Sequence, residues 1–99
     1  MARKRITAVR LIEDAPATGW QPSHIERVVW VEDGKAFPQE QPRETVARAA
    51  NAGEPFYVRA ADGTEVAVRA QLRHGRYYLT AVAGAAQPEL LLTLPVHVR

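Results

Sequence analysis

Arginine and tyrosine alternate with apolar residues in the second half of the chain, and this spacing is the pattern in the sequence that best fits a binding chemistry. Residues two apart on a β-strand share one face of the sheet. Three predicted strands, 55–60, 64–69 and 76–82, therefore place basic and aromatic side chains on a common surface. Arginine contacts phosphate and stacks on bases, and a tyrosine ring offers a flat face to a base, as in proteins that hold single-stranded nucleic acid. The residues predicted to bind nucleic acid on this surface are Tyr57, Arg59, Arg69, Arg76 and Tyr78.

The other face of the same strands is apolar and is expected to pack against the core. A solvated outer sheet face is the alternative interpretation of the polar side, because arginine and tyrosine are common on exposed strands and Glu65 lies among them. The residues assigned to the apolar face are Phe56, Val58, Val66, Val68, Tyr77 and Leu79.

A leucine-rich segment near the C-terminus supports a second hypothesis, self-association. A short apolar run cannot be assigned to a strand or to a helical turn by its period alone. The run can pack on the sheet of its own chain as a closing strand, or it can add to a strand edge of a second copy and form a symmetric dimer, which we favour. The residues predicted to mediate self-association are Leu90, Leu91, Leu92 and Leu94.

Residues typical of catalysis or metal binding are sparse. Ser23 and His24 are neighbours in the sequence, but a catalytic pair needs spatial reach and an orienting acid. His24, His74 and His97 are too widely spaced for a local metal motif, and the absence of cysteine excludes disulfides and thiolate sites. The glycines occur singly and match no phosphate-binding loop. We therefore expect a binding protein that is not an enzyme and has no metal and no cofactor.

The length, charge and hydropathy of the chain limit the number of domains and the kinds of partner to expect. Its 99 residues suit a single domain, within which residues 1–4 are expected to lie outside the ordered part. Thirteen Lys and Arg against eleven Asp and Glu leave a net charge of only +2, so composition alone does not indicate a nucleic-acid partner. No segment approaches the ~20 apolar residues of a membrane span, and the N-terminus lacks a signal peptide. We expect a cytoplasmic location and no membrane partner.

The elements that position these residues follow from residue type and turn signals. Residues 37–41 are predicted to be a linker, and Val46, Ala49 and Ala50 form the apolar stripe of a short helix. The predicted fold is α+β, a β-β-α-β-β-β antiparallel sheet with one helix covering one face. The predicted elements are strands 6–12 and 24–31, helix 42–50, and strands 55–60, 64–69 and 76–82.

The chain resembles a family of small bacterial proteins catalogued as a domain of unknown function. The resemblance rests on the opening Ile-Thr-Ala-Val-Arg at 6–10, on Val29-Trp30, on Tyr78-Leu79-Thr80 and on the closing Leu-Leu-Thr-Leu-Pro at 91–95. The chain departs from the family pattern at Pro88-Glu89-Leu90. The resemblance implies a compact cytoplasmic domain and carries no activity or catalytic residue to transfer.

Overall fold

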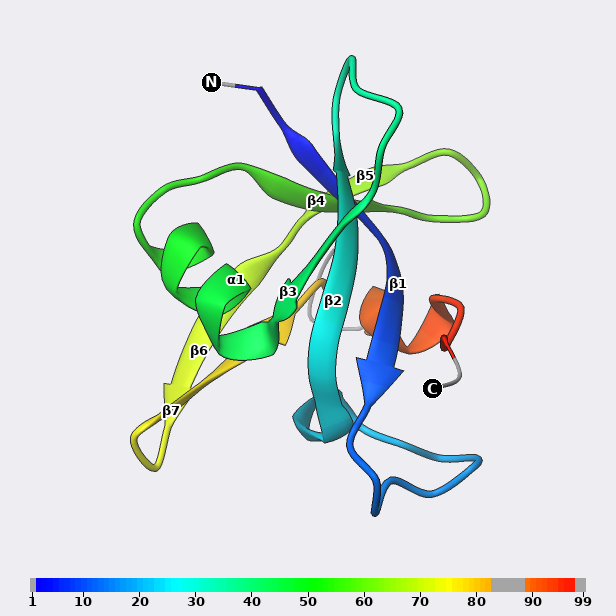
Figure 1. The fold of residues 1–99 in the computed structure, drawn as a ribbon, viewed down its shortest axis with the longest axis vertical. Helices are drawn as coiled ribbons and strands as arrows, with labels where there is room; N and C mark the ends of the chain where they lie inside the picture. Colours follow the sequence, from blue (N-terminus) through cyan, green and yellow to red (C-terminus); the bar gives the residue numbers. More distant parts are fainter. Residues whose placement is uncertain (1, 83–88, 98–99) are drawn as a thin grey trace.

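The computed structural model describes residues 2–82 and 89–97 and has an α+β fold, as predicted from the sequence. Within these residues one α-helix and two short 3₁₀ helices accompany two β-sheets (Figure 1). The elements in chain order are β1 (Lys4–Leu11), η1 (Pro22–His24), β2 (Ile25–Glu32), β3 (Gln39–Pro42), α1 (Arg43–Asn51), β4 (Phe56–Arg59), β5 (Glu65–Ala67), β6 (Arg69–Arg73), β7 (Arg76–Thr80) and η2 (Leu90–Thr93).

The larger sheet has five strands in the order β3-β2-β1-β4-β5. Its neighbouring strands are antiparallel except β1 and β4, which pair in parallel at Lys4 with Phe56 and at Arg5 with Tyr57. The prediction of an entirely antiparallel sheet is wrong at this pair. The reason is that α1 carries the chain from β3 across to β4, and two strands joined by a crossover helix run in the same direction. Because β3 and β1 are both antiparallel to β2, β4 also runs in the same direction as β1.

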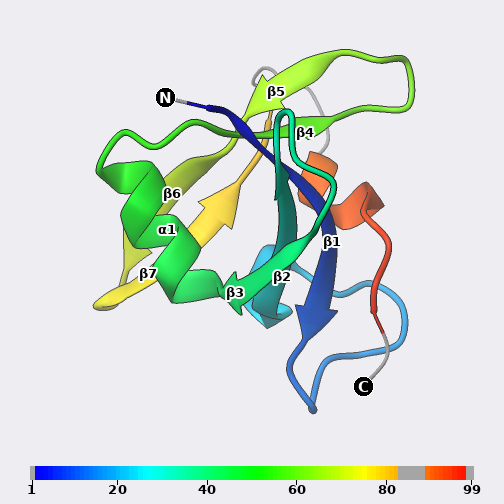
Figure 2. The same ribbon diagram turned by 45° about the horizontal axis from the view of Figure 1, so that its top comes forward.

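A separate two-stranded sheet is formed by the antiparallel hairpin β6–β7. Val68 separates β5 from β6, and its N–H donates to the Phe56 carbonyl at 2.9 Å, so the chain turns out of the larger sheet at this residue. Figure 2 shows α1 lying across the hairpin and beside β2. The helix therefore packs between the two sheets instead of covering one continuous surface.

An additional edge strand, β3, occupies most of the segment predicted to be a linker. Gln39 pairs with Trp30 and Pro42 with Arg27 on β2. The strand is short and polar and shows no apolar alternation, so the period-2 signal of a strand is missing from its sequence. Proline is tolerated there because an edge strand need not donate every backbone N–H.

The core lies between the larger sheet, α1 and the hairpin. The predicted apolar face is confirmed for Phe56, Val58, Val66, Val68 and Leu79, all of which are buried, whereas Tyr77 is half-buried. On the helix, the buried residues are Val46 and Ala47, and the predicted Ala49 and Ala50 are half-buried against the same core.

The N-terminal segment is part of the fold from Arg3 onward, so the prediction that residues 1–4 lie outside the ordered domain is wrong for Arg3 and Lys4. Lys4 begins β1, and its ammonium donates to Glu54 at 2.8 Å while lying 5.1 Å from the Trp30 ring centroid. Both partners are distant in the sequence, so no local signal indicates them. Residue 1 lies outside the described residues.

Candidate functional site

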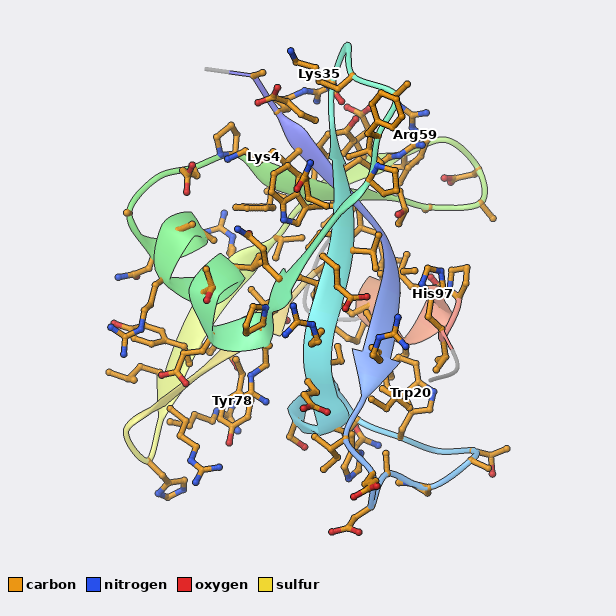
Figure 3. The ribbon with its side chains drawn as sticks, viewed as in Figure 1. Lys4, Trp20, Lys35, Arg59, Tyr78 and His97 are labelled. Atoms are coloured by element: carbon orange, nitrogen blue, oxygen red, sulfur yellow. The ribbon has the colours of Figure 1, made fainter. Side chains whose placement is uncertain are left out.

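The residues predicted to form one nucleic-acid surface fall on two different sheets. Tyr57 and Arg59 belong to β4 of the larger sheet. The other three, Arg69, Arg76 and Tyr78, belong to the β6–β7 hairpin. Figure 3 shows Arg59 and Tyr78 at opposite corners of the molecule. The single continuous surface is not formed, because β7 pairs with β6 and not with β5.

Tyr57 is enclosed by a network of charged side chains. The residue is only 6% exposed, its hydroxyl donates to Asp33 Oδ1 at 2.7 Å, and the Arg3 guanidinium lies 4.3 Å from the ring centroid. Both Arg3 (2.6 Å) and Arg59 (2.9 Å) form ion pairs with Glu65. We call these five residues the β4 cluster. Its aromatic face is already covered, so Tyr57 offers no surface for stacking a base.

The same network shifts the pKa values of its members. Hydrogen bonds from Arg3 and then from Arg59 lower the pKa of Glu65 below its ordinary value of 4.5. Burial, followed by the hydrogen bond to Asp33, raises the pKa of the Tyr57 hydroxyl above its ordinary value of 10.0. The cluster therefore favours an ionised Glu65 and a neutral Tyr57, which suits a structural role.

We expect the protein to lose stability as the pH falls below about 4.5, in part through Glu65. A carboxyl with a lowered pKa in the folded state stabilises the fold above its unfolded-state pKa, and this contribution disappears as the pH drops through the folded-state value. Thermal unfolding from about pH 6 to pH 3 should therefore show a smaller loss of stability in Glu65→Gln. Glu40→Gln should remove a second part, because Arg10 and Arg27 lower the pKa of Glu40. A Glu65→Gln profile parallel to that of the wild type would contradict this role.

The β6–β7 hairpin presents a polar face whose members are fixed by register. Directly opposite residues on antiparallel strands share a face. The cross-strand pairs on this face are Arg69 with Thr80, Gln71 with Tyr78, and Arg73 with Arg76. We call these six residues the hairpin face.

The turn of the hairpin places the two arginines Arg73 and Arg76 opposite each other. The turn residues His74 and Gly75 both have positive φ, 50° and 77°, as a two-residue type I′ turn requires. Like charges directly opposite on paired strands destabilise the pair. The hairpin thus carries an unfavourable electrostatic contact that a bound anion would relieve.

The arginines of the hairpin face have no acidic partner among the residues that the structure describes. Arg69, Arg73 and Arg76 are all exposed, and none of them forms an ion pair with a described carboxylate. The sequence contains no Asp or Glu between Glu65 and Glu89. The rest of the sequence has ten Lys and Arg against eleven Asp and Glu, so the net charge of +2 comes from these three arginines.

A further cation, Arg43, supports the aromatic residue of the hairpin face. Arg43 lies at the start of α1 with its guanidinium 4.5 Å from the Tyr78 ring centroid. It donates to the carbonyls of Tyr77 and Ile25, each at 3.0 Å. Its stacking on the ring positions Tyr78. Both hydrogen-bond partners are neutral carbonyls, so they do not offset the positive charge of Arg43.

A hollow of about 360 Å³ lies beside the hairpin face. Opposite the hairpin, the hollow is lined by Ser23 of η1. The next residue, His24, accepts a hydrogen bond at Nδ1 from the Gln21 N–H at 2.8 Å. His24 thus closes the turn of η1. One carboxylate lines the hollow, Glu89, which accepts a hydrogen bond from the Thr80 hydroxyl at 2.6 Å. The other polar lining residues are Gln21, Ser23, Gln71, Arg73, His74 and Tyr78.

The leucines predicted to mediate self-association form a 3₁₀ turn, not a closing strand. Leu91 is fully buried in the core of its own chain, and Leu90 and Leu94 are half-buried against it. Only Leu92, at 37% exposure, presents substantial surface. In the folded chain Leu91 is therefore not available to a partner. Self-association stays a prediction, because Leu90, Leu91 and Leu94 pack against the core of their own chain.

Sequence reasoning missed Gln71, Arg73 and Arg43. A signal for Arg73 was present, since the stretch without acidic residues from 66 to 88 contains three arginines and not two. The stacking of Arg43 on Tyr78 had no sequence signal, because 35 positions separate them.

No family model, no curated protein and no solved structure matches this chain. The resemblance of its opening and closing segments to a bacterial family therefore stays a prediction. In the described part of the chain, no group of three or more His, Asp or Glu side chains is placed to hold a metal ion. No helix there has the length and apolar character needed to cross a bilayer.

Proposed function

We propose that this protein binds single-stranded nucleic acid through the hairpin face. The observation that carries the proposal is the pair Arg73 and Arg76, which lie directly opposite each other, exposed and without a described acidic partner. A phosphate placed between two guanidinium groups accepts charge-assisted hydrogen bonds from both and removes their repulsion.

The remaining residues of the hairpin face extend this contact along the strands. Arg69 lies four residues from Arg73 on β6, which is about 13 Å at ~3.3 Å per residue, so it can reach a second phosphate. Tyr78 lies between these positions and is half-buried, with Arg43 over one face of its ring, so the other face is the one offered to a base. Gln71 opposite it offers an amide for hydrogen bonding. Phosphate contacts on either side of Tyr78 along the hairpin suit an unpaired nucleic-acid strand, whose bases are free to turn toward the protein.

We expect a fluorescent single-stranded oligonucleotide to bind at low salt and to dissociate as salt increases. Three phosphate contacts on a single strand give a slope of about −2 for log K against log salt, since each contributes about −0.7. Affinity measured by fluorescence anisotropy should then fall about 20-fold between 50 and 200 mM salt.

Two results would count against the proposal. One is the absence of binding at 50 mM salt, where phosphate contacts are strong. The other is equal or tighter binding of the same sequence as a duplex, because phosphate attraction alone would then account for the affinity and the aromatic residue would have no part in it.

A further inference from the structure

A groove opens beside η2, at the point where β1 and β4 separate. The two strands pair only at Lys4 and Arg5, and a register shift between Ile6 and Ala8 then bends β1 away. Further along, Val9 pairs with the C-terminal segment instead, donating to the Pro95 carbonyl at 3.0 Å. Residues at the end of β4 and in η2 line the opening, and Figures 1 and 2 show η2 lying beside β1. A groove of about 570 Å³ results, within the size range of small-molecule sites.

The walls of the groove are mostly apolar. Both threonines that line it direct their hydroxyl groups toward backbone carbonyls: Thr93 donates to Leu90 at 2.7 Å and Thr7 to Val29 at 3.5 Å. The groove therefore exposes their methyl groups more than their polar atoms. The apolar residues of the wall are Ile6, Ala60, Ala61, Leu90, Leu94 and Pro95.

Two charged residues line the groove, Arg5 of β1 and Arg59 of β4. Arg59 shares Glu65 with Arg3, whereas Arg5 is half-buried and forms no ion pair with a described carboxylate. None of the described residues that line the groove is acidic. Arg5 also lines a smaller hollow with Glu32 and Asp33 but pairs with neither. A guanidinium without a described carboxylate partner, next to an apolar wall, has the planar set of donors that matches the two oxygens of a carboxylate.

We propose that this groove binds an aliphatic monocarboxylate, with the carboxylate on Arg5 and the hydrocarbon chain along Leu90 and Leu94. Arg5, which has no ion-pair partner among the described residues, accounts for one carboxylate, and the apolar wall accounts for a chain that carries no other polar group. The site is separate from the hairpin face and does not depend on nucleic-acid binding.

Titration of the wild-type protein with sodium octanoate, followed by ¹⁵N NMR and calorimetry, tests the proposal. We expect saturable binding with shifts at residues of the groove, at least tenfold weaker binding of octanol, and an affinity that rises about fourfold for each added methylene from hexanoate to octanoate. Equal binding of octanol and octanoate would overturn the role of the carboxylate. Equal binding of butyrate and octanoate would overturn the role of the chain.

Two variants locate the site. Arg5→Gln should weaken octanoate binding at least tenfold, while Arg48→Gln, on the exposed side of α1, should leave it unchanged. Ala61→Leu should weaken binding by filling the groove from an exposed position at its edge. Unchanged affinity in both Arg5→Gln and Ala61→Leu would refute the site, whatever the oligonucleotide result.

Discussion

Replacing Arg69, Arg73 and Arg76 together with glutamate is expected to weaken binding of a single-stranded oligonucleotide by about 1,000-fold at low salt. A hydrogen bond to a charged group contributes about 1.5–3 kcal/mol, so each arginine accounts for at least about tenfold. Because all three are exposed and make no described ion pair, their replacement should leave the fold intact. Fluorescence anisotropy gives the affinity, and circular dichroism checks the fold.

A matched control changes the same amount of charge elsewhere. Lys35, Arg48 and Arg59 are exposed basic residues outside the hairpin, and their combined replacement with glutamate should weaken binding less than tenfold. Equal losses in the two triple variants would mean that net charge, and not the hairpin face, controls binding. The control also tests Arg59, which the sequence grouped with the hairpin residues and the structure assigns to the β4 cluster.

Leu91→Ala is expected to be the most destabilising of the leucine substitutions, lowering the free energy of unfolding by about 2–5 kcal/mol. Leu91 is fully buried, so its truncation leaves a cavity in the core. For a domain of this size the melting temperature should fall by at least about 10 °C, measured by thermal unfolding.

Leu92→Ala is the matched control one residue away, and we expect a loss below about 1 kcal/mol because Leu92 is 37% exposed. Light scattering on Leu92→Glu addresses self-association separately. A dimeric wild type that becomes monomeric in Leu92→Glu would support an interface at this turn. Equal destabilisation by Leu91→Ala and Leu92→Ala would contradict the burial of Leu91.

The sequence alone was sufficient where the determining contacts are local. The hairpin of β4 and β5 turns at Asp62 and Gly63, where the Asp62 carboxylate accepts from the Thr64 N–H at 2.9 Å and Gly63 adopts a φ of 91°. These interactions span a few residues, so turn chemistry and alternation predict them together. The same alternation correctly separates the buried Val58 and Val66 from the exposed Arg59.

The sequence could not decide which strands become neighbours. Parity assigns a side chain to one face of its own strand, but the partner strand depends on where the chain leaves a sheet, which happens here at Val68. For this reason Tyr57 and Tyr78, which the alternation assigns to one common face, lie on different sheets. The parallel pairing of β1 with β4 likewise follows from the packing of α1 and has no counterpart in local residue patterns.

At the candidate site, too, the sequence predicts the local features and the tertiary structure decides the contacts between distant residues. That the stretch from 66 to 88 is free of acidic residues, and that His74-Gly75 forms its turn, can be read from the sequence because both are local properties. Which arginines remain unpaired was decided only by the tertiary structure. Arg59 meets Glu65 across a hairpin and Arg3 reaches the same carboxylate from 62 residues away. Arg73 and Arg76, in contrast, form no ion pair with a described carboxylate, and the carboxylate of Glu89 beside the hairpin accepts from Thr80 and from the Ala81 N–H instead. An ion pair depends on distance in space, and that distance is set by the fold.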